Sequence, residues 1–154
     1  MRTVLDVEPG TTLYSRAYDH ETNQVAKLYS QFGLLISSKP TCLTRRKLGE
    51  RLVCLWEELE EFLQAADEGD LSAMADALVD LVVFAKGTAV MMGLPWAALF
   101  DDVMRANTAK VRGVGKRGHK VDLIKPPGWQ GSQGKAILLE HGYDPADSTE
   151  VDDE

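Results

Sequence analysis

The chain has 154 residues, of which 44% are hydrophobic and 27% are charged, and its formal net charge is −7. This is the size and balance of one globular domain with its own core. No apolar run reaches the roughly 20 residues of a membrane span, and the N-terminus lacks the apolar run of a secretion signal. The two cysteines, Cys42 and Cys54, have no partners at zinc spacing, so we expect reduced thiols in a cytoplasmic protein.

Helical periodicity is strong in four places, whereas strand signals are sparse. After an N-terminal extension over residues 1–18, the first predicted helix spans 19–32, begins at an N-cap of Asp19 or Thr22, and is stopped by a glycine. Residues 34–40 form a linker. The expected apolar face of this helix consists of Val25, Leu28, Tyr29 and Phe32.

The second predicted helix begins near Thr41 or Thr44, ends near Ala66, and is followed by a turn at Gly69. Apolar residues recur along it at steps of four and three, which predicts one buried stripe. That stripe comprises Leu48, Leu52, Leu55, Leu59 and Phe62.

The third predicted helix spans 71–92 and is apolar on nearly every side, which indicates burial inside the protein or in an interface between subunits. One pair of long helices offers too little cover for it, so we expect a homodimer or tetramer with its sites near the interface. The fourth helix begins at Pro95, a favoured first-turn residue, and ends near Lys110.

Residues 111–143 are rich in glycine and proline and predict a loop-rich arm with a short fifth helix at 133–140. The last eleven residues, 144–154, carry six acids and no base, which predicts a disordered, solvated tail. The elements together predict an all-α bundle of four to five antiparallel helices with a core over 19–110. A basic strip near the arm contains Arg105, Lys110, Arg112, Lys116, Arg117, Lys120 and Lys125.

Acidic side chains line one edge of the second helix. At about 100° per residue, Glu58 and Glu61 lie at the border of the apolar stripe, one turn apart. Glu57 neighbours Glu61 four residues away, whereas Glu60 falls on the solvent side. Two carboxylates at this spacing can share a cation and repel each other without one.

Asp76 and Asp80 share one face of the apolar third helix, where an unpaired carboxylate is expensive to bury. We therefore predict that the acidic faces of the second and third helices oppose each other across Mg²⁺ or Mn²⁺, which prefer carboxylate oxygen. Two alternatives stay open from spacing alone: a solvated helix face, and core acids satisfied by arginine or backbone donors.

Near the end of the fourth helix, Asn107 and Lys110 share a face and are candidates for phosphate contact. A lysine near the negative end of the helix dipole explains the same pattern equally well.

These motifs resemble those of the MazG-like all-α NTP pyrophosphohydrolase superfamily, whose signature is E-x-x-E, then E-x-x-D, then an Asn and a Lys. The resemblance covers residues 19–110. Ala77 departs from it at the first acid of E-x-x-D, where Asp76 is one residue early. A weaker similarity to phage-type, dGTP-directed (MazZ-like) members continues from Lys125 through Pro126, Pro127 and Gly128 to Trp129.

The resemblance implies hydrolysis of a nucleoside triphosphate to the monophosphate and pyrophosphate, in host cytoplasm for a phage protein. It implies two or three Mg²⁺ ions (or Mn²⁺), bound by Glu58, Glu61 and Asp80 with Asp76 as a conditional ligand. Glu57 or Glu58 would orient or deprotonate the attacking water. Lys110 and Asn107, with Arg112, Lys116 and Arg117, would bind phosphate, and Phe32 and Trp56 would contact the base, with dGTP or GTP as first choice.

Other functions compete with this one. Phosphoribosyl-ATP or another nucleotide could be the substrate on the same fold. A helical nucleic-acid-binding module would use the basic strip, although its acidic pairs would face the charge of the nucleic acid. A dimerisation module would explain the apolar third helix but not Asp76 and Asp80. A P-loop is excluded because the glycines at 113–118 lack its spacing and follow no strand.

Overall fold

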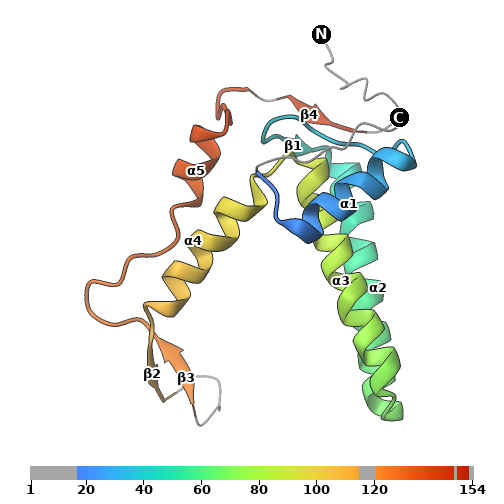
Figure 1. The fold of residues 1–154 in the computed structure, drawn as a ribbon, viewed down its shortest axis with the longest axis vertical. Coiled ribbons are helices and arrows are strands. Elements are labelled where there is room, and N and C mark those ends of the chain that lie inside the picture. The colour runs from blue at the N-terminus through green and yellow to red at the C-terminus, as the bar shows by residue number, and fades with distance from the viewer. Residues whose placement is uncertain (1–16, 115–120, 148, 153–154) are drawn as a thin grey trace.

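The computed structural model describes residues 17–114, 121–147 and 149–152. Two legs diverge from a common top, where α1, β1 and β4 lie (Figure 1). One leg is a helical hairpin, and the other consists of α4, a small two-stranded ribbon and α5. The helices of the described residues are α1 His20–Gln31, α2 Arg45–Glu68, α3 Leu71–Met91, α4 Trp96–Thr108 and α5 Gly134–Glu140, and the strands are β1 Cys42–Leu43, β2 Val111–Gly113, β3 Asp122–Ile124 and β4 Glu150–Val151.

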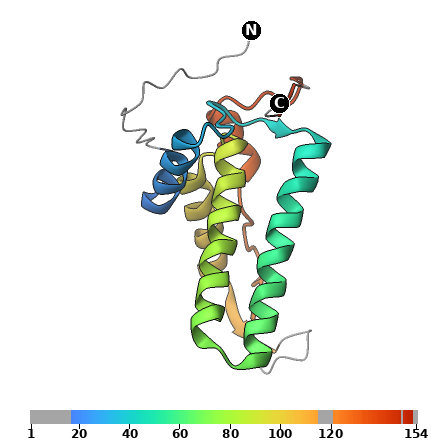
Figure 2. The same ribbon diagram turned by 90° about the vertical axis from the view of Figure 1, so that its right-hand side faces the viewer.

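The helical hairpin of α2 and α3 follows local signals in the sequence. The Thr44 hydroxyl accepts from the backbone N–H of Lys47 and caps α2, and Gly69 ends α2 in the left-handed region at φ +70°. Asp70 then caps α3 by accepting from the N–H groups of its first turn. The two helices lie antiparallel and side by side over their length (Figure 2).

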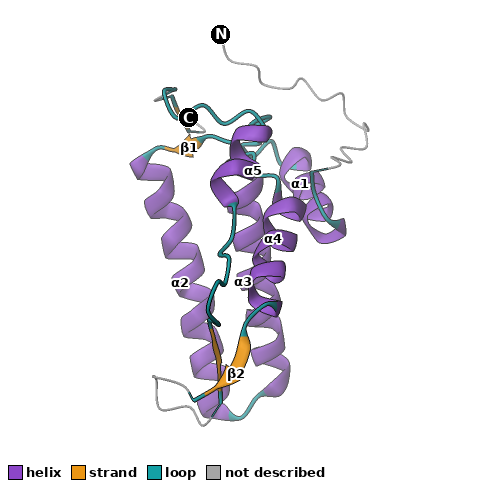
Figure 3. Cartoon of the chain, turned by 90° about the vertical axis from the view of Figure 1, so that its left-hand side faces the viewer, coloured by secondary structure: helices purple, strands orange, loops and turns teal. Residues whose placement is uncertain are grey.

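The second leg begins at a tight turn after α3. Gly93 has φ +62°, and a Cβ there would lie 2.3 Å from the carbonyl oxygen of Lys39, so this turn requires glycine. The direction of the chain changes by 120° between α3 and α4, and α4 packs against α5 (Figure 3). The predicted helices are therefore present, but in one chain they do not close into a bundle of antiparallel neighbours.

Within the described ranges, no single helix has both the length and the hydropathy of a membrane span. The segments α3 and α4 pass that test only as a pair, across the 120° bend.

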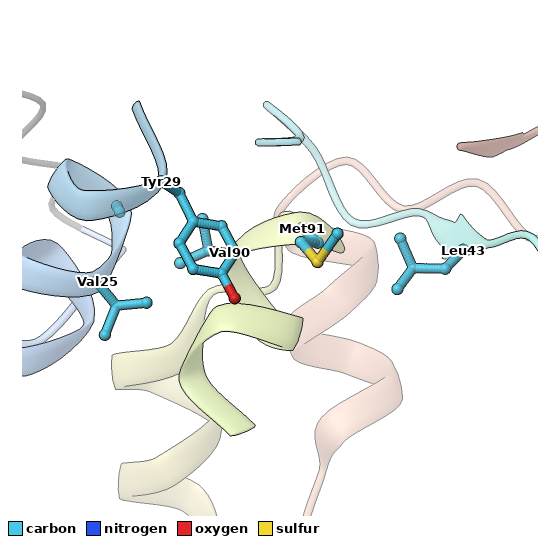
Figure 4. Packing of buried hydrophobic residues seen from close by; sticks show 6 residues of the cluster. Val25, Tyr29, Leu43, Val90 and Met91 are labelled. Atoms are coloured by element: carbon cyan, nitrogen blue, oxygen red, sulfur yellow. The ribbon is translucent and has the colours of Figure 1, made fainter. Parts of the chain in front are cut away.

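The buried core lies where α1 packs on the upper part of α3. Val25 and Tyr29 of α1 contact Val90 and Met91 of α3, and Leu43 of β1 completes the cluster (Figure 4). Half of the predicted apolar face of α1 belongs to this core. The other two residues, Leu28 and Phe32, are exposed, because α1 covers α3 along one narrow line of contact.

Tyr29 packs so closely on α3 that residue 87 must lack a side chain. A Cβ on Gly87 would lie 2.0 Å from the Tyr29 hydroxyl. We therefore expect Gly87→Ala to lower the free energy of unfolding by about 1–3 kcal/mol, as overpacking does in other cores. Gly49, in the exposed part of α2, has nothing within 4 Å of an added Cβ, so Gly49→Ala should instead raise it by about 0.5–1 kcal/mol. Urea denaturation of both variants measures the contrast, and equal effects would contradict the packing described.

The acidic C-terminal segment contacts the top of the fold. β4 pairs in parallel with β1, in the register Cys42↔Glu150. Asp152 accepts from the Thr44 hydroxyl and from Arg46, both at 2.5 Å, and Asp147 pairs with Lys39 at 3.2 Å. Composition alone predicts a disordered tail, but basic and hydroxyl partners at the start of α2 hold the described part of it in place.

Much of the predicted buried stripe on α2 is uncovered in the single chain. Leu52 is 64% exposed and Leu59 is 46% exposed. The lower half of α3 is similar, with Val79 60% exposed. Exposed large apolar side chains gathered on the same helix faces are typical of a surface that another molecule covers. The exposed apolar residues of the hairpin are Leu48, Leu52, Val53, Trp56, Leu59, Leu63, Leu71, Leu78, Val79 and Val82.

Candidate active site

The hairpin places the acidic residues of both helices at the same height. Glu58 and Asp80 each lie eleven residues from Gly69, on opposite sides of the turn. Because α2 and α3 run antiparallel from that turn, residues at equal separations from it face each other. Glu61 and Asp76 lie about one turn nearer to Gly69, eight and seven residues from it, so they face each other to within one residue. The predicted opposition of the two acidic pairs follows from this register.

Glu58 is the centre of this acidic group. The residue is half-buried, and its Oε2 atom is buried without a hydrogen-bond partner. Burial raises the pKa of Glu58 above the usual carboxyl value, and neighbouring negative charges raise it further. In decreasing order of effect, those charges are Glu61, Asp80, Glu57 and Asp76.

The basic residues nearest in sequence to this group have other partners. Arg51 donates to the Thr88 hydroxyl and to the carbonyl oxygen of Phe84, each at 3.0 Å, and so ties α2 to α3. Lys86 contacts both carboxylate oxygens of Asp19 at 2.9 Å, at the start of α1. Among the residues that the structure describes, none of the five carboxylates forms an ion pair. The sequence left open the alternative that arginine side chains pair with these carboxylates. In the described residues they do not.

The acidic group fits a divalent cation by its chemistry. Its donors are carboxylate oxygens, which suit Mg²⁺ or Mn²⁺, and the buried Oε2 of Glu58 lacks the partner that a buried charge requires. As the side chains are placed, no three acidic, histidine or cysteine groups of the described ranges converge on a single point. Like charges repel across the hairpin, so a closed coordination shell needs the cation to draw these side chains together.

The departure at Ala77 has a structural counterpart. Ala77 is 3% exposed, whereas Asp76, one residue earlier, is exposed. Of the four neighbouring charges, that of Asp76 has the smallest effect on the pKa of Glu58. Asp76 thus lies at the edge of the acidic group, and the charges of Glu61 and Asp80 have the larger effects on the pKa of Glu58.

Asn107 and Lys110 lie together on the other leg, at the end of α4. The ammonium of Lys110 donates to Oδ1 of Asn107 at 2.8 Å and lies 5.7 Å from the ring centroid of Trp129. The indole N–H of Trp129 donates to the carbonyl oxygen of Ala106 at 2.7 Å. Since α4 diverges from the hairpin, one chain does not bring this pair to the carboxylates (Figure 1).

The remaining predicted site residues are dispersed. Arg112 is exposed on β2, and Lys116 and Arg117 lie outside the described residues. Trp56 is 62% exposed and donates to Glu60 on the solvent side of α2, about 200° around the helix from Glu58. Phe32, at the end of α1, is 66% exposed. The structure therefore does not bring the two aromatic residues together as walls of one base pocket.

Sequence reasoning did not select Lys125 and Trp129 as site residues. Lys125 lies 4.5 Å from the centroid of the Trp129 ring, on the same aromatic side chain that Lys110 approaches. The local signals are the turn sequence of Pro126, Pro127 and Gly128 and the membership of Lys125 in the basic strip. The proximity of Lys125 to Lys110 depends on the pairing of β2 with β3, and residue spacing along the chain does not predict that pairing.

A helical hairpin that opposes carboxylates on two helices agrees with the nucleotide pyrophosphohydrolases of the MazG-like, all-α kind, and a comparison with known families places the chain among them. The family model described as phosphoribosyl-ATP pyrophosphohydrolase matches residues 25–107, which is 83 of the 154 residues, and the chain belongs to this family. No curated protein matches the sequence. The match begins within α1, contains all of α2 and α3, and ends at Asn107, one residue before the end of α4. It supports phosphoribosyl-ATP or a related nucleotide better than it supports dGTP, and it leaves the substrate undetermined.

Proposed function

We propose that the protein hydrolyses a nucleotide to its monophosphate form and pyrophosphate, with Mg²⁺ or Mn²⁺ bound by the carboxylates of the α2–α3 hairpin. The observation that carries this proposal is the buried, unpartnered Oε2 of Glu58 amid four other carboxylates. Family membership supports the reaction class.

Within this proposal the carboxylates have graded roles. Glu58, Glu61 and Asp80 hold the metal, and Asp76 is an outer ligand. When bound, two or three such cations neutralise phosphate charge and make a water molecule more acidic. Glu57 or Glu58 accepts the proton of the attacking water. Lys110, held by Asn107, and Arg112 bind phosphate oxygens.

The oligomeric state is the second part of the proposal. A homodimer, or a tetramer built from it, would cover the apolar stripes of α2 and α3, which a single chain leaves exposed. The arm of one copy could then lie over the hairpin of the other. Such an arrangement would bring Asn107 and Lys110 to the carboxylates and place the active sites near the interface.

Two substrate classes deserve the first tests. Phosphoribosyl-ATP comes first because the matched family model carries that description. A purine deoxynucleoside triphosphate, with dGTP foremost, comes second. Its support is the weaker similarity of the segment from Lys125 to Trp129 to dGTP-directed enzymes, and this segment lies beyond the matched region. Nucleic acid and membrane are not expected as partners.

The expected result is release of pyrophosphate from at least one of these nucleotides with Mg²⁺ or Mn²⁺, abolished by EDTA. A screen of phosphoribosyl-ATP and the eight common (d)NTPs by coupled pyrophosphate detection measures this. No release from any of them with either metal would refute the proposed reaction for these substrates. Hydrolysis that continues in EDTA would refute the metal assignment alone.

A further inference from the structure

The base of the β2–β3 ribbon brings two lysines together. The strands are antiparallel, and the last pair of their register is Val111↔Ile124. Lys110 directly precedes β2 and Lys125 directly follows β3, so the two lysines are the next facing pair at the open end of the ribbon. Like charges at facing positions destabilise a strand pair. The arrangement therefore needs a compensating partner.

Part of that compensation comes from Trp129. The backbone N–H of Trp129 donates to the carbonyl oxygen of Pro126 at 3.1 Å, and Gly128 has φ +75°, which is a turn of the type that requires glycine at its third position. The turn brings the indole to within 4.5 Å of the Lys125 ammonium and 5.7 Å of the Lys110 ammonium. Both ammonium groups are thus attracted to the electron-rich ring.

A purely structural role explains only part of this geometry. The bond from the Trp129 indole to Ala106 satisfies one of the last carbonyl groups of α4 and fixes the arm to that helix. It does not explain why Lys125 lies against the same ring. An ammonium has three N–H donors, and Lys110 directs one of them at Asn107. The others can serve a ligand that carries several negative oxygens.

We propose that Lys110 and Lys125, positioned by the Trp129 indole, form a binding site for a polyphosphate chain. Its natural ligand is the pyrophosphate portion of the nucleotide, so the inference rests on the proposed function and adds Lys125 as a phosphate-binding residue and Trp129 as a positioning residue. Two ammonium groups held at one ring offer more N–H donors and more positive charge to a chain of phosphates than a single lysine does. The site lies on the arm, outside the carboxylate hairpin.

The first test measures binding without catalysis. Isothermal titration calorimetry of the full chain with inorganic tripolyphosphate, in buffer containing EDTA, should show binding that Lys125→Met weakens about tenfold or more, the effect of losing a charge-assisted contact. Lys125→Arg should largely restore it. Lys135→Met, an exposed lysine on α5 of the same leg, is the matched control for net charge and should bind like the wild type. Equal loss in both methionine variants would overturn the site.

The second test separates positioning from structure. Trp129→Phe keeps an aromatic ring and loses the N–H bond to Ala106, whereas Trp129→Leu loses both. If the ring positions the lysines, Trp129→Phe should retain most of the tripolyphosphate affinity and Trp129→Leu should not, with both folded by circular dichroism. Affinity that falls equally in both variants would assign Trp129 a structural role and overturn its part of the proposal.

Kinetics distinguish this inference from the proposed function. With an active nucleotide, Lys125→Met should raise KM and the inhibition constant of pyrophosphate about tenfold while kcat stays within about threefold, the pattern of a lost binding contact. If wild type hydrolyses no nucleotide but binds tripolyphosphate through Lys125, the reaction fails and the site stands. If hydrolysis occurs and Lys125→Met behaves like Lys135→Met, the site fails and the reaction stands. Binding of duplex DNA, but not tripolyphosphate, through Lys125 would also overturn it.

Discussion

Glu58→Gln should abolish nucleotide hydrolysis, with kcat/KM falling at least about 100-fold, as expected when a metal-binding carboxylate is neutralised. The reason is that Glu58 is the one member of the acidic group with a buried, unpartnered oxygen, and its pKa responds to all four neighbours. The amide keeps the size of the side chain but cannot neutralise a cation. Steady-state pyrophosphate release measures the loss.

The same substitution should make the metal-free protein more stable. It removes a negative charge that burial and four carboxylates disfavour. Because the folded state raises the pKa of Glu58, it binds a proton more tightly than the unfolded chain does, so the contribution of Glu58 to stability falls as pH rises from the ordinary carboxyl pKa through the raised one. The difference in melting temperature between wild type and Glu58→Gln in EDTA should widen over that window, and Mg²⁺ should narrow it.

Glu60→Gln is the control for this prediction. Glu60 lies on the same helix, its substitution changes charge by the same amount, and its carboxylate accepts from the indole N–H of Trp56 instead of joining the acidic group. Its activity should stay within about threefold of wild type, as is usual for surface substitutions. A fully active Glu58→Gln, or equal losses in the two variants, would refute the metal role assigned to Glu58.

Leu52→Glu should convert the oligomer to a monomer. Leu52 is 64% exposed in the single chain, on the face that we propose a second copy covers. A glutamate there would place an unpaired charge in an apolar interface, which weakens association by about 100-fold or more. Sedimentation velocity should show wild type at a multiple of the 17.0-kDa chain mass and the variant at that mass. Activity should fall with it, because Lys110 and Asn107 would lose the hairpin of the partner.

The matched control for association is Leu34→Glu. Leu34 is 43% exposed in the segment after α1, outside both the hairpin and the arm, so the same change there should leave the oligomer intact. A wild-type protein that sediments as a monomer, or a Leu52→Glu variant that stays oligomeric, would exclude an interface on this face of α2.

The helices could be predicted because their signals are local. The cap at Asp19, the left-handed glycine at position 69 and the proline at position 95, which is the N-cap of α4 and not its first helical residue, act within a few residues of the ends that they define. The facing of Glu58 and Asp80 could also be predicted, since an antiparallel hairpin with a tight turn leaves little freedom in register. Each of these predictions needed only one or two neighbouring elements.

Contacts between distant segments could not be predicted in the same way. The 120° bend before α4 depends on Gly93 lying against Lys39, and the docking of Asp152 joins segments 108 residues apart. The proximity of Lys125 to Trp129 depends on strand register. The apolar stripe of α2 was also only partly predictable. Its periodicity predicts a buried face but does not say whether the same chain or a second copy buries it.

The boundary between the two legs has a consequence for how such a protein can change over time. The carboxylates lie on one continuous segment, 57–80, within the matched family region, whereas the lysine–indole cluster is largely beyond it. The carboxylates proposed for hydrolysis and the lysines proposed for phosphate binding are thus encoded by separate segments of the chain. Replacing residues 111–143 with the arm of another family member should therefore alter which nucleotide is accepted while leaving the hydrolytic chemistry in place.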